Sequence, residues 1–242
     1  MMDWSAIFLT LRLALVVCAL LLIIGMPIAS WLSFSKWRYK FFVESIVALP
    51  LVLPPTVLGF YVLVAMGSQS PFGRWYQSIS GHAMPFTFTG LVIASVIYSL
   101  PFAVQPMTAA FGQVDRNLIN ASSTLGASRL RTFIRIVLPL SLGGVVTGVV
   151  LSFAHTLGEF GVVLMVGGNI PGVTQTVSIA IYDHVQALDY AGANHMALLL
   201  LAFSFITLSI TYSLNRRAGI FYRPYRDSAL RPEVGFAKTR RH

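Results

Sequence analysis

Charged residues are scarce in this sequence. Only 10% of its 242 residues are charged and 56% are hydrophobic, whereas an ordinary soluble domain is about 25% charged. Long stretches such as 45–73, 75–114 and 196–214 contain no formal charge. About 20 apolar residues cross the hydrocarbon core of a bilayer, and a soluble fold of this length could bury one such run but not five. The composition therefore excludes a soluble domain and predicts an integral membrane protein.

Cysteine and clustered metal ligands are also lacking. The single cysteine, Cys18, lies within an apolar run and cannot form an intrachain disulfide. The histidines are scattered along the chain: His82, His155, His184, His195 and His242. We therefore expect no metal site and no catalytic residues. An intramembrane enzyme, one alternative from another functional class, is left with almost no candidate side chains.

Lysine is nearly absent, and this bears on nucleotide chemistry. The lysines are Lys36, Lys40 and Lys238, which follow Ser, Tyr and Ala. A phosphate-binding loop of the form G-x-x-x-x-G-K-[ST] needs a lysine directly after glycine. We therefore expect this chain to bind no cofactor and to hydrolyse no ATP itself.

The basic residues that are present alternate from one connection to the next. They gather in 36–40, in 116–135 and in the tail from Arg216 onward, whereas the remaining connections hold only Arg74. Cytoplasmic connections of membrane proteins are enriched in Lys and Arg. The pattern predicts an N-terminus outside the cell, a cytoplasmic C-terminus and an odd number of spans. Because the net charge of +9 is divided among these connections, it does not indicate nucleic-acid binding.

Hydropathy places the spans and predicts an all-α fold. We expect five transmembrane helices, at about 7–32, 43–66, 89–110, 139–166 and 196–214. A short helix within 174–185 is too polar to span and is expected at the outer face. The membrane domain is predicted over 1–215, followed by a basic cytoplasmic tail over 216–242. Gly144 and Gly148 form a small-xxx-small pair that favours close helix packing.

Prolines interrupt the predicted second span. Pro50, Pro54 and Pro55 remove backbone donors and disfavour a straight helix. In hydrocarbon such a break is tolerated where it packs against protein or lines a wet cavity, so an ordinary kink and a break beside a translocation path both remain open. Milder bends are expected in the first span at Pro27 and in the third at Pro101 and Pro106.

The connection 111–138 carries the most informative motif. It contains Asn120-Ala121-Ser122-Ser123-Thr124-Leu125-Gly126, then nine residues, then Ile136-Val137-Leu138-Pro139. This resembles the coupling loop of binding-protein-dependent ABC import permeases, E-A-A-x3-G-x9-I-x-L-P. The residues that match in register are Ala121, Gly126, Ile136, Leu138 and Pro139, with Asn120 in place of the usual Glu. A helix over 118–125, a turn at Gly126 and a second helix from Ser128 would form a compact knob.

Three further segments narrow the resemblance. Residues 49–59, 155–161 and 168–176 resemble those of molybdate importer permeases, and the similarity covers about 5–215. It implies molybdate as cargo, with tungstate a near-identical oxyanion. Sulfate and thiosulfate permeases are the alternative within transport. An assembly factor is the other alternative from a different class, and the coupling motif argues against it.

The resemblance also implies partners. They are two ATP-binding cassette subunits that carry ATP and Mg²⁺, a substrate-binding protein on the outer face, a second copy of the chain, the oxyanion and membrane lipid. Five spans are too few to enclose a path alone, and twofold symmetry is the commonest arrangement of copies.

Candidate residues of the path or its gate are Pro54, Pro55, Glu159, Thr174 and Thr176. Glu159 lies four residues after His155, and ionisable groups in a span face the bundle interior or water. The two side chains either pair with each other or a neighbouring helix, or Glu159 shapes a gate. Because a carboxylate repels an anion, Glu159 is not expected to bind the cargo.

Overall fold

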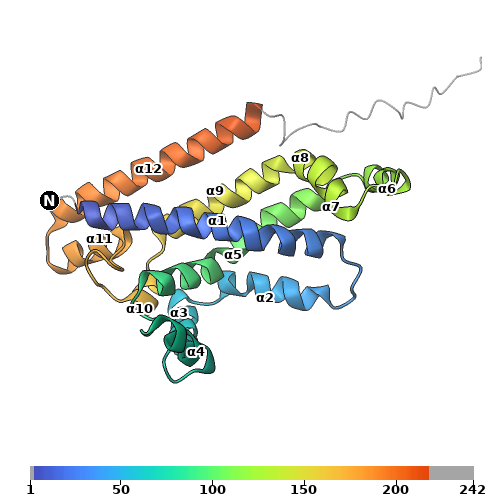
Figure 1. The fold of residues 1–242 in the computed structure, drawn as a ribbon. Helices are drawn as coiled ribbons and strands as arrows, with labels where there is room; N and C mark the ends of the chain where they lie inside the picture. Colours follow the sequence, from blue (N-terminus) through green and yellow to red (C-terminus); the bar gives the residue numbers. More distant parts are fainter. Residues whose placement is uncertain (1–2, 218–242) are drawn as a thin grey trace, which may run out of the picture.

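The computed structural model describes residues 3–217, and this part of the chain is helical without strands (Figure 1). The helices are α1 (Trp4–Phe34), α2 (Lys40–Val52), α3 (Pro55–Met66), α4 (Pro71–Ser80), α5 (Phe88–Gly112), α6 (Arg116–Thr124), α7 (Arg129–Thr132), the π-helix η1 (Phe133–Val137), α8 (Leu138–Leu140), α9 (Leu142–Gly158), α10 (Gly161–Gly167), α11 (Val177–Gln186) and α12 (Tyr190–Arg217). The expected all-α class is confirmed.

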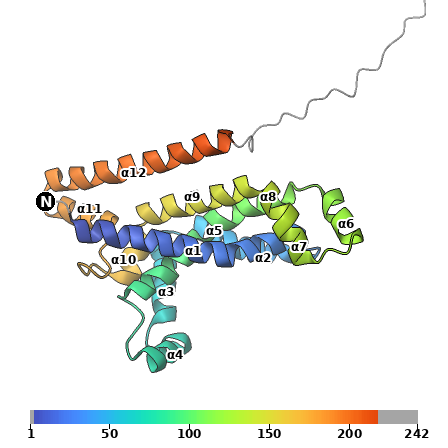
Figure 2. The ribbon, with the colours of Figure 1, turned by 45° about the horizontal axis from the view of Figure 1, so that its top comes forward.

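Helices α1, α5 and α9 form the centre of the bundle. Leu13, Val17 and Leu21 of α1 belong to one buried cluster with Val104 and Met107 of α5. Helix α12 lies beside this group, where it contacts α9 and α11 (Figures 1 and 2). Only 17% of the apolar window of α12 is buried. Its remaining apolar surface suits lipid or another subunit.

Small residues bring α5 and α9 close together, as their spacing predicts. A Cβ atom added at Gly148 would lie 2.8 Å from the carbonyl oxygen of Ala103. One added at Gly144 would lie 2.8 Å from the carbonyl oxygen of Pro106. The hydroxyl of Ser141 also donates to the carbonyl of Ala110 at 3.2 Å. The backbones of the two helices therefore approach to a distance that larger residues would prevent.

The prolines differ in their effect. Helix α1 continues through Pro27, and α5 continues through Pro101 and Pro106. The expected span 43–66, in contrast, consists of two helices bent by 114°. Consecutive Pro54 and Pro55 remove two donors, and the residue before a proline is driven to extended backbone. Pro54 accordingly has ψ 137.

The expected fourth span is likewise broken. Helix α9 ends at Gly158, and a new helix, α10, begins at Gly161. At its start, α9 is bent by 75° from the segment Arg129–Leu140. Helices α1, α5 and Tyr190–Ser209 of α12 are each long and apolar enough to cross a membrane, and counting each bent pair as one span brings the number up to five. The upper of these two counts agrees with the predicted five spans.

The bundle has two distinct ends. One end carries the α1–α2 connection and α6, the other carries the N-terminus and α11, and α12 runs from the second end toward the first (Figure 1). These are the groupings that the alternation of basic residues predicts. Helix α12 runs two residues past the expected boundary at 215, and residues 218–242 of the basic tail lie outside the described residues.

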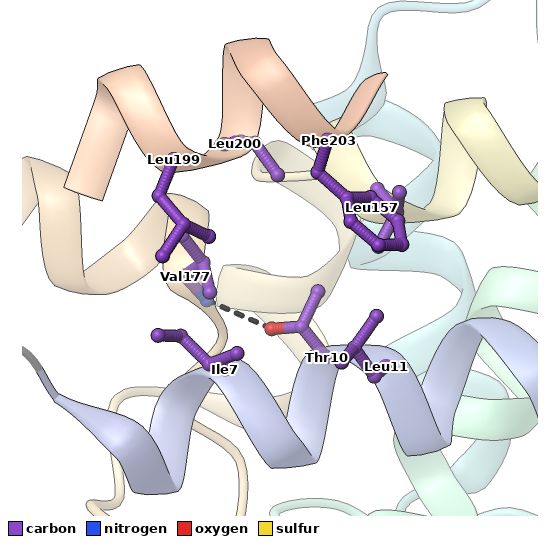
Figure 3. Close-up of a pocket in the computed structure, with 8 residues that line it drawn as sticks. All are labelled: Ile7, Thr10, Leu11, Leu157, Val177, Leu199, Leu200 and Phe203. Atoms are coloured by element: carbon purple, nitrogen blue, oxygen red, sulfur yellow. Dashed lines mark hydrogen bonds between the residues drawn. The ribbon is translucent and has the colours of Figure 1, made fainter. Parts of the chain in front are cut away.

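Helix α11 is fixed to the bundle at the N-terminal end. The backbone N–H of Val177 donates to Thr10 Oγ1 of α1 at 2.9 Å, beside a small apolar pocket (Figure 3). The connection to α12 is capped by Asp189, which accepts from the Gly192 N–H and lies 2.9 Å from His184 Nδ1. The hydrogen bond from Gly192 lowers the pKa of the Asp189 carboxyl. As expected, α11 is too short to span.

Candidate functional site

The connection between α5 and α9 folds into a knob, residues 115–140, whose first part is a capped helix and a tight turn. Asp115 begins α6 by accepting a hydrogen bond from the Asn117 N–H at 2.8 Å. The chain then reverses at Gly126, whose φ is +78, a left-handed value that favours glycine. Ser128 caps the following helix by accepting from the Arg131 N–H at 3.3 Å. The predicted helix–turn–helix is therefore present.

The two arms of the knob are tied to each other and to the membrane helices. The buried hydroxyls of Ser122 and Thr132 hydrogen-bond across the turn. The Ala127 N–H also donates to the Ser122 carbonyl at 3.1 Å. The Phe133 ring packs edge-on against Phe111 of α5 at 5.4 Å between centroids. The knob therefore packs directly against α5.

The residues at the positions of the coupling motif divide into two groups. Asn120, Ala121 and Gly126 are exposed at the tip of the knob. At its base Ile136 and Leu138 are half-buried, with Leu138 packed against the main core, and exposed Pro139 lies in the first turn of α8. The first group can contact a partner, whereas the second joins the knob to α9.

Exposed apolar side chains surround the tip. Leu125 is 87% exposed and Leu130 is 68% exposed. Leu118 and Ile134 are exposed as well. Side chains of this kind at a polar end of a bundle are typical of a surface that another protein covers.

The second candidate site lies where the two broken spans meet. Pro55 begins α3 and Gly161 begins α10, and a Cβ atom added at Gly161 would lie 2.7 Å from Pro55 Cβ. Further along, a Cβ atom added at Gly59 would lie 2.8 Å from Met165 Cβ. Helices α3 and α10 therefore pack closely, and each is separated from the preceding helix by a break. We call α3 and α10 together the paired segment.

Glu159 lies in the second of these breaks. Its side chain is 4% exposed, and both carboxylate oxygens lack a hydrogen-bond partner within the described part of the chain. Of the alternatives left open for His155, the contact with a neighbouring helix is the one that forms, since His155 Nδ1 lies 3.0 Å from Ser99 Oγ of α5 and its ring stacks on Phe102. The Ser95 hydroxyl on α5 is a hydrogen-bonding neighbour of the Glu159 carboxylate, although neither group has a partner at full hydrogen-bond geometry. The break thus holds a buried ionisable group that forms no ion pair within the described residues.

The two candidate threonines lie in the turn that follows α10. Thr174 Oγ1 donates to the Gly167 carbonyl at 2.7 Å and accepts from the Ile170 N–H at 3.2 Å. Thr176 is 1% exposed, and its hydroxyl has no partner among the described residues. Asn169 and Gln175 both donate to Asp183 of α11. Thr174 therefore holds the turn against the C-terminal end of α10. The N-terminal end of the same helix makes the contact between Gly161 and Pro55.

The sequence was compared with known proteins. Residues 5–220 match the family described as binding-protein-dependent transport system inner membrane component. The molybdenum transport system permease protein ModB of Azotobacter vinelandii is 51% identical over 90% of this chain and 97% of its own length. ModB of Escherichia coli strain K12 is 36% identical over 88% of this chain and 94% of its own. A probable sulfate transport permease, cysT of Prototheca wickerhamii, is 30% identical over 88% and 82%.

Solved structures show the same fold. The MetNI methionine ABC transporter in an inward-facing conformation matches with a TM-score of 0.67 at 17% identity, over 88% of this chain and 94% of that chain. An importer of the polysaccharide alginate matches with a TM-score of 0.69 at 20% identity, over 88% and 78%. With the family match spanning nearly the whole described chain, the protein belongs to the inner membrane components of binding-protein-dependent transport systems.

Proposed function

We propose that this chain is the membrane-spanning permease of an ATP-driven importer that carries molybdate into the cytoplasm. The observation that carries the cargo assignment is the 51% identity, over 90% of the chain, to a molybdenum transport permease. Tungstate, a near-identical oxyanion, is expected to use the same path. The sulfate permease relatives are less similar, at 30% to 33% identity.

The physics of the cargo requires an energy source. A dianion that enters a negative-inside cell works against about 2.3 kcal/mol per charge for each 100 mV, which is about 4.6 kcal/mol for two charges. Accumulation from a dilute medium adds to this cost. Because the sequence has no phosphate-binding loop, ATP and Mg²⁺ are assigned to a partner subunit and no cofactor to this chain.

The knob is the proposed contact with that partner. Its tip, with Asn120, Ala121 and Gly126, would dock on an ATP-binding cassette subunit. The exposed side chains of Leu125 and Leu130 would be buried in that contact. Two copies of the chain would use two such subunits. Since Phe133 joins the knob to α5, closure of the ATPases would move α5 together with it.

The paired segment is the proposed gate. The breaks at Leu53–Pro54 and Glu159–Phe160 interrupt the helices and would act as joints, while Gly59 and Gly161 keep α3 and α10 in close contact. The segment would therefore turn as one body when α5 moves. Glu159 would then change its surroundings without binding the anion, which its carboxylate repels.

The remaining assignments complete the assembly. The knob end faces the cytoplasm, as its basic residues indicate, and the N-terminus and α11 face outward. A substrate-binding protein would deliver the oxyanion at that outer end. A second copy would enclose the path, and lipid would cover the remaining apolar surface.

Reconstituted vesicles test the proposal. They would contain the full chain, its ATPase and a molybdate-binding protein, and the uptake of molybdate, tungstate and sulfate would be measured with and without ATP. We expect ATP-dependent uptake of molybdate that tungstate inhibits. If ATP turnover instead responded only to sulfate with a sulfate-binding protein, the chain would be a sulfate permease.

A further inference from the structure

An unusual density of aromatic residues surrounds the first connection at the knob end. The exposed rings belong to Trp31, Phe34, Trp37, Tyr39, Phe41 and Phe42. Most of these rings contact the next ring along the chain. The distances between ring centroids are 5.9 Å for Trp31 and Trp37, 5.8 Å for Trp37 and Tyr39, and 4.3 Å for Phe41 and Phe42. The rings thus form a continuous exposed surface, residues 31–42, that we call the collar.

Three cations are interleaved with these rings. Lys36, Arg38 and Lys40 alternate with aromatic residues along the chain. The Arg38 guanidinium lies over the Tyr39 ring at 4.9 Å. Within residues 3–217, Lys40 is the only one of the three with an ion-pair partner, Glu44 at 3.5 Å. Lys36 and Arg38 have no ion-pair partner within the described residues.

The length of α1 supports a position of the collar at the depth of lipid headgroups. Helix α1 has 31 residues, which at 1.5 Å per residue is about 46 Å. A hydrocarbon core is about 30 Å thick, and a bilayer with its headgroups is about 40–45 Å. A helix of this length centred in a bilayer extends beyond the hydrocarbon at both ends, which would place Trp31 and Phe34 of its last turns among the headgroups. The α2 helix begins at Lys40, and its residues Phe42, Ile46 and Leu49 are exposed and apolar, as suits a return into hydrocarbon.

The aromatic group away from the knob end provides a contrast. On α4 the rings of Phe72 and Trp75 stack at 5.9 Å and Ile79 is exposed nearby. This group has a single cation, Arg74. Aromatic residues anchor proteins at both membrane interfaces, so rings alone do not distinguish the two groups. The difference is the number of cations.

We propose that the collar is a binding site for the headgroups of anionic phospholipids, with Lys36 and Arg38 contacting phosphate and the rings at the boundary of the acyl chains. Cations near a membrane surface attract anionic lipid, and amphipathic rings prefer the headgroup region. A soluble partner would be held at the knob tip, whereas the collar continues directly into the apolar surface of α2. Its assignment to the cytoplasmic leaflet rests on the proposed orientation, but the lipid preference itself does not.

Tryptophan fluorescence in nanodiscs tests the proposal. In a full chain that keeps only Trp37, with Trp4, Trp31 and Trp75 changed to Phe, quenching by brominated phosphatidylglycerol is compared with quenching by brominated phosphatidylcholine. A second full chain keeps only Trp75 and is the matched control. Both leaflets of a nanodisc have the same lipids, so a wrong orientation would leave this result unchanged.

We expect brominated phosphatidylglycerol to be enriched around Trp37 and not around Trp75. Lys36→Gln combined with Arg38→Gln should lower the enrichment by about fivefold per cation and leave ATPase co-purification unchanged. Equal quenching of Trp37 by the two lipids, or enrichment that survives the double change, would overturn the lipid site. Loss of ATPase co-purification in the double variant would identify the collar as a protein contact instead.

Discussion

Gly126 combines a required backbone conformation with an exposed position. Its φ is +78, and an added Cβ atom would meet nothing within 4 Å. Gly126→Val should therefore cost about 1–2 kcal/mol through the left-handed backbone, a small loss for a protein of this size. We expect near-normal amounts in the membrane, but weaker ATPase co-purification and lost molybdate uptake, because the knob tip changes shape.

Gly81 is the matched control for this substitution. Its φ is +76, an added Cβ atom also meets nothing within 4 Å, and it ends α4, away from the knob. Gly81→Val applies the same backbone strain and should retain uptake. If the two variants behaved alike, strain and not ATPase contact would explain the loss, and the role assigned to the knob tip would be wrong.

At single residues, the sequence predicts backbone conformation better than it predicts side-chain partners. The motif predicts the turn at Gly126 because glycine after a short helix has a local backbone reason. The spacing of His155 and Glu159 predicts a shared helix face, but α9 ends at Gly158, so Glu159 leaves the helix. His155 then bonds to Ser99 of another helix. Contacts between distant helices are not encoded in local spacing.

Among the helices, the contact between α3 and α10 gives a second prediction. A Cβ atom added at Gly161 would lie 2.7 Å from Pro55 Cβ, whereas one at Gly158 meets nothing within 4 Å. Gly161→Ala should push α3 away, at about 1–3 kcal/mol for overpacking, and lower the melting temperature in detergent by about 2–4 °C per kcal/mol.

Gly158→Ala is its control, because it flanks Glu159 on the other side and has free space. It should keep the wild-type melting temperature and uptake. Uptake is expected to fall in Gly161→Ala if the paired segment is the gate. A normal rate in that variant, despite a lowered melting temperature, would leave the contact structural and remove the gate assignment.

The attachment of α11 to α1 gives a third prediction. Thr10 Oγ1 accepts the buried N–H of Val177 at 2.9 Å (Figure 3) and donates to the Ala6 carbonyl. Thr10→Val leaves that N–H unpaired, which costs about 1–3 kcal/mol. We expect a lower melting temperature than for Thr108→Val, whose hydroxyl bonds to the Val104 carbonyl of its own helix. Equal melting temperatures would show that α11 is held by packing alone.

Helix α4 shows a local signal that the hydropathy analysis missed. Ser70 caps the helix by accepting from the Gly73 N–H, Pro71 occupies its first turn, and Gly81 ends it in a left-handed conformation. Ser before Pro and Gly beyond the last turn are standard start and stop signals. The sequence therefore contains this helix, but a search for apolar runs passes over it.

The 114° bend between α2 and α3 was only partly foreseeable, since isolated prolines in α1 and α5 leave those helices unbroken.

For the molecule as a whole, composition and charge predict the architecture well because both act on whole segments. Apolar length sets the number of spans, and the alternation of basic residues assigns each connection to one of two ends, as Figure 1 shows for α6 and α11. The cargo follows from neither property. A translocation path between two copies would be lined by both of them, and the structure contains one copy. The identity of the transported oxyanion is therefore inferred from the relatives of this chain.

The orientation of the two ends is the last prediction. In a Cys18→Ala background, a single cysteine replaces Ser78 of α4 or Ser123 of α6, both exposed in the structure. Because the connections on either side of the spans differ in basic residues, a membrane-impermeant maleimide added to intact cells should label position 78 and not 123. Breaching the membrane should expose 123. Neither serine caps a helix end, so both variants should fold normally. Equal labelling of the two positions in intact cells would contradict the five-span arrangement, and labelling of 123 alone would invert the proposed orientation and place the collar in the outer leaflet.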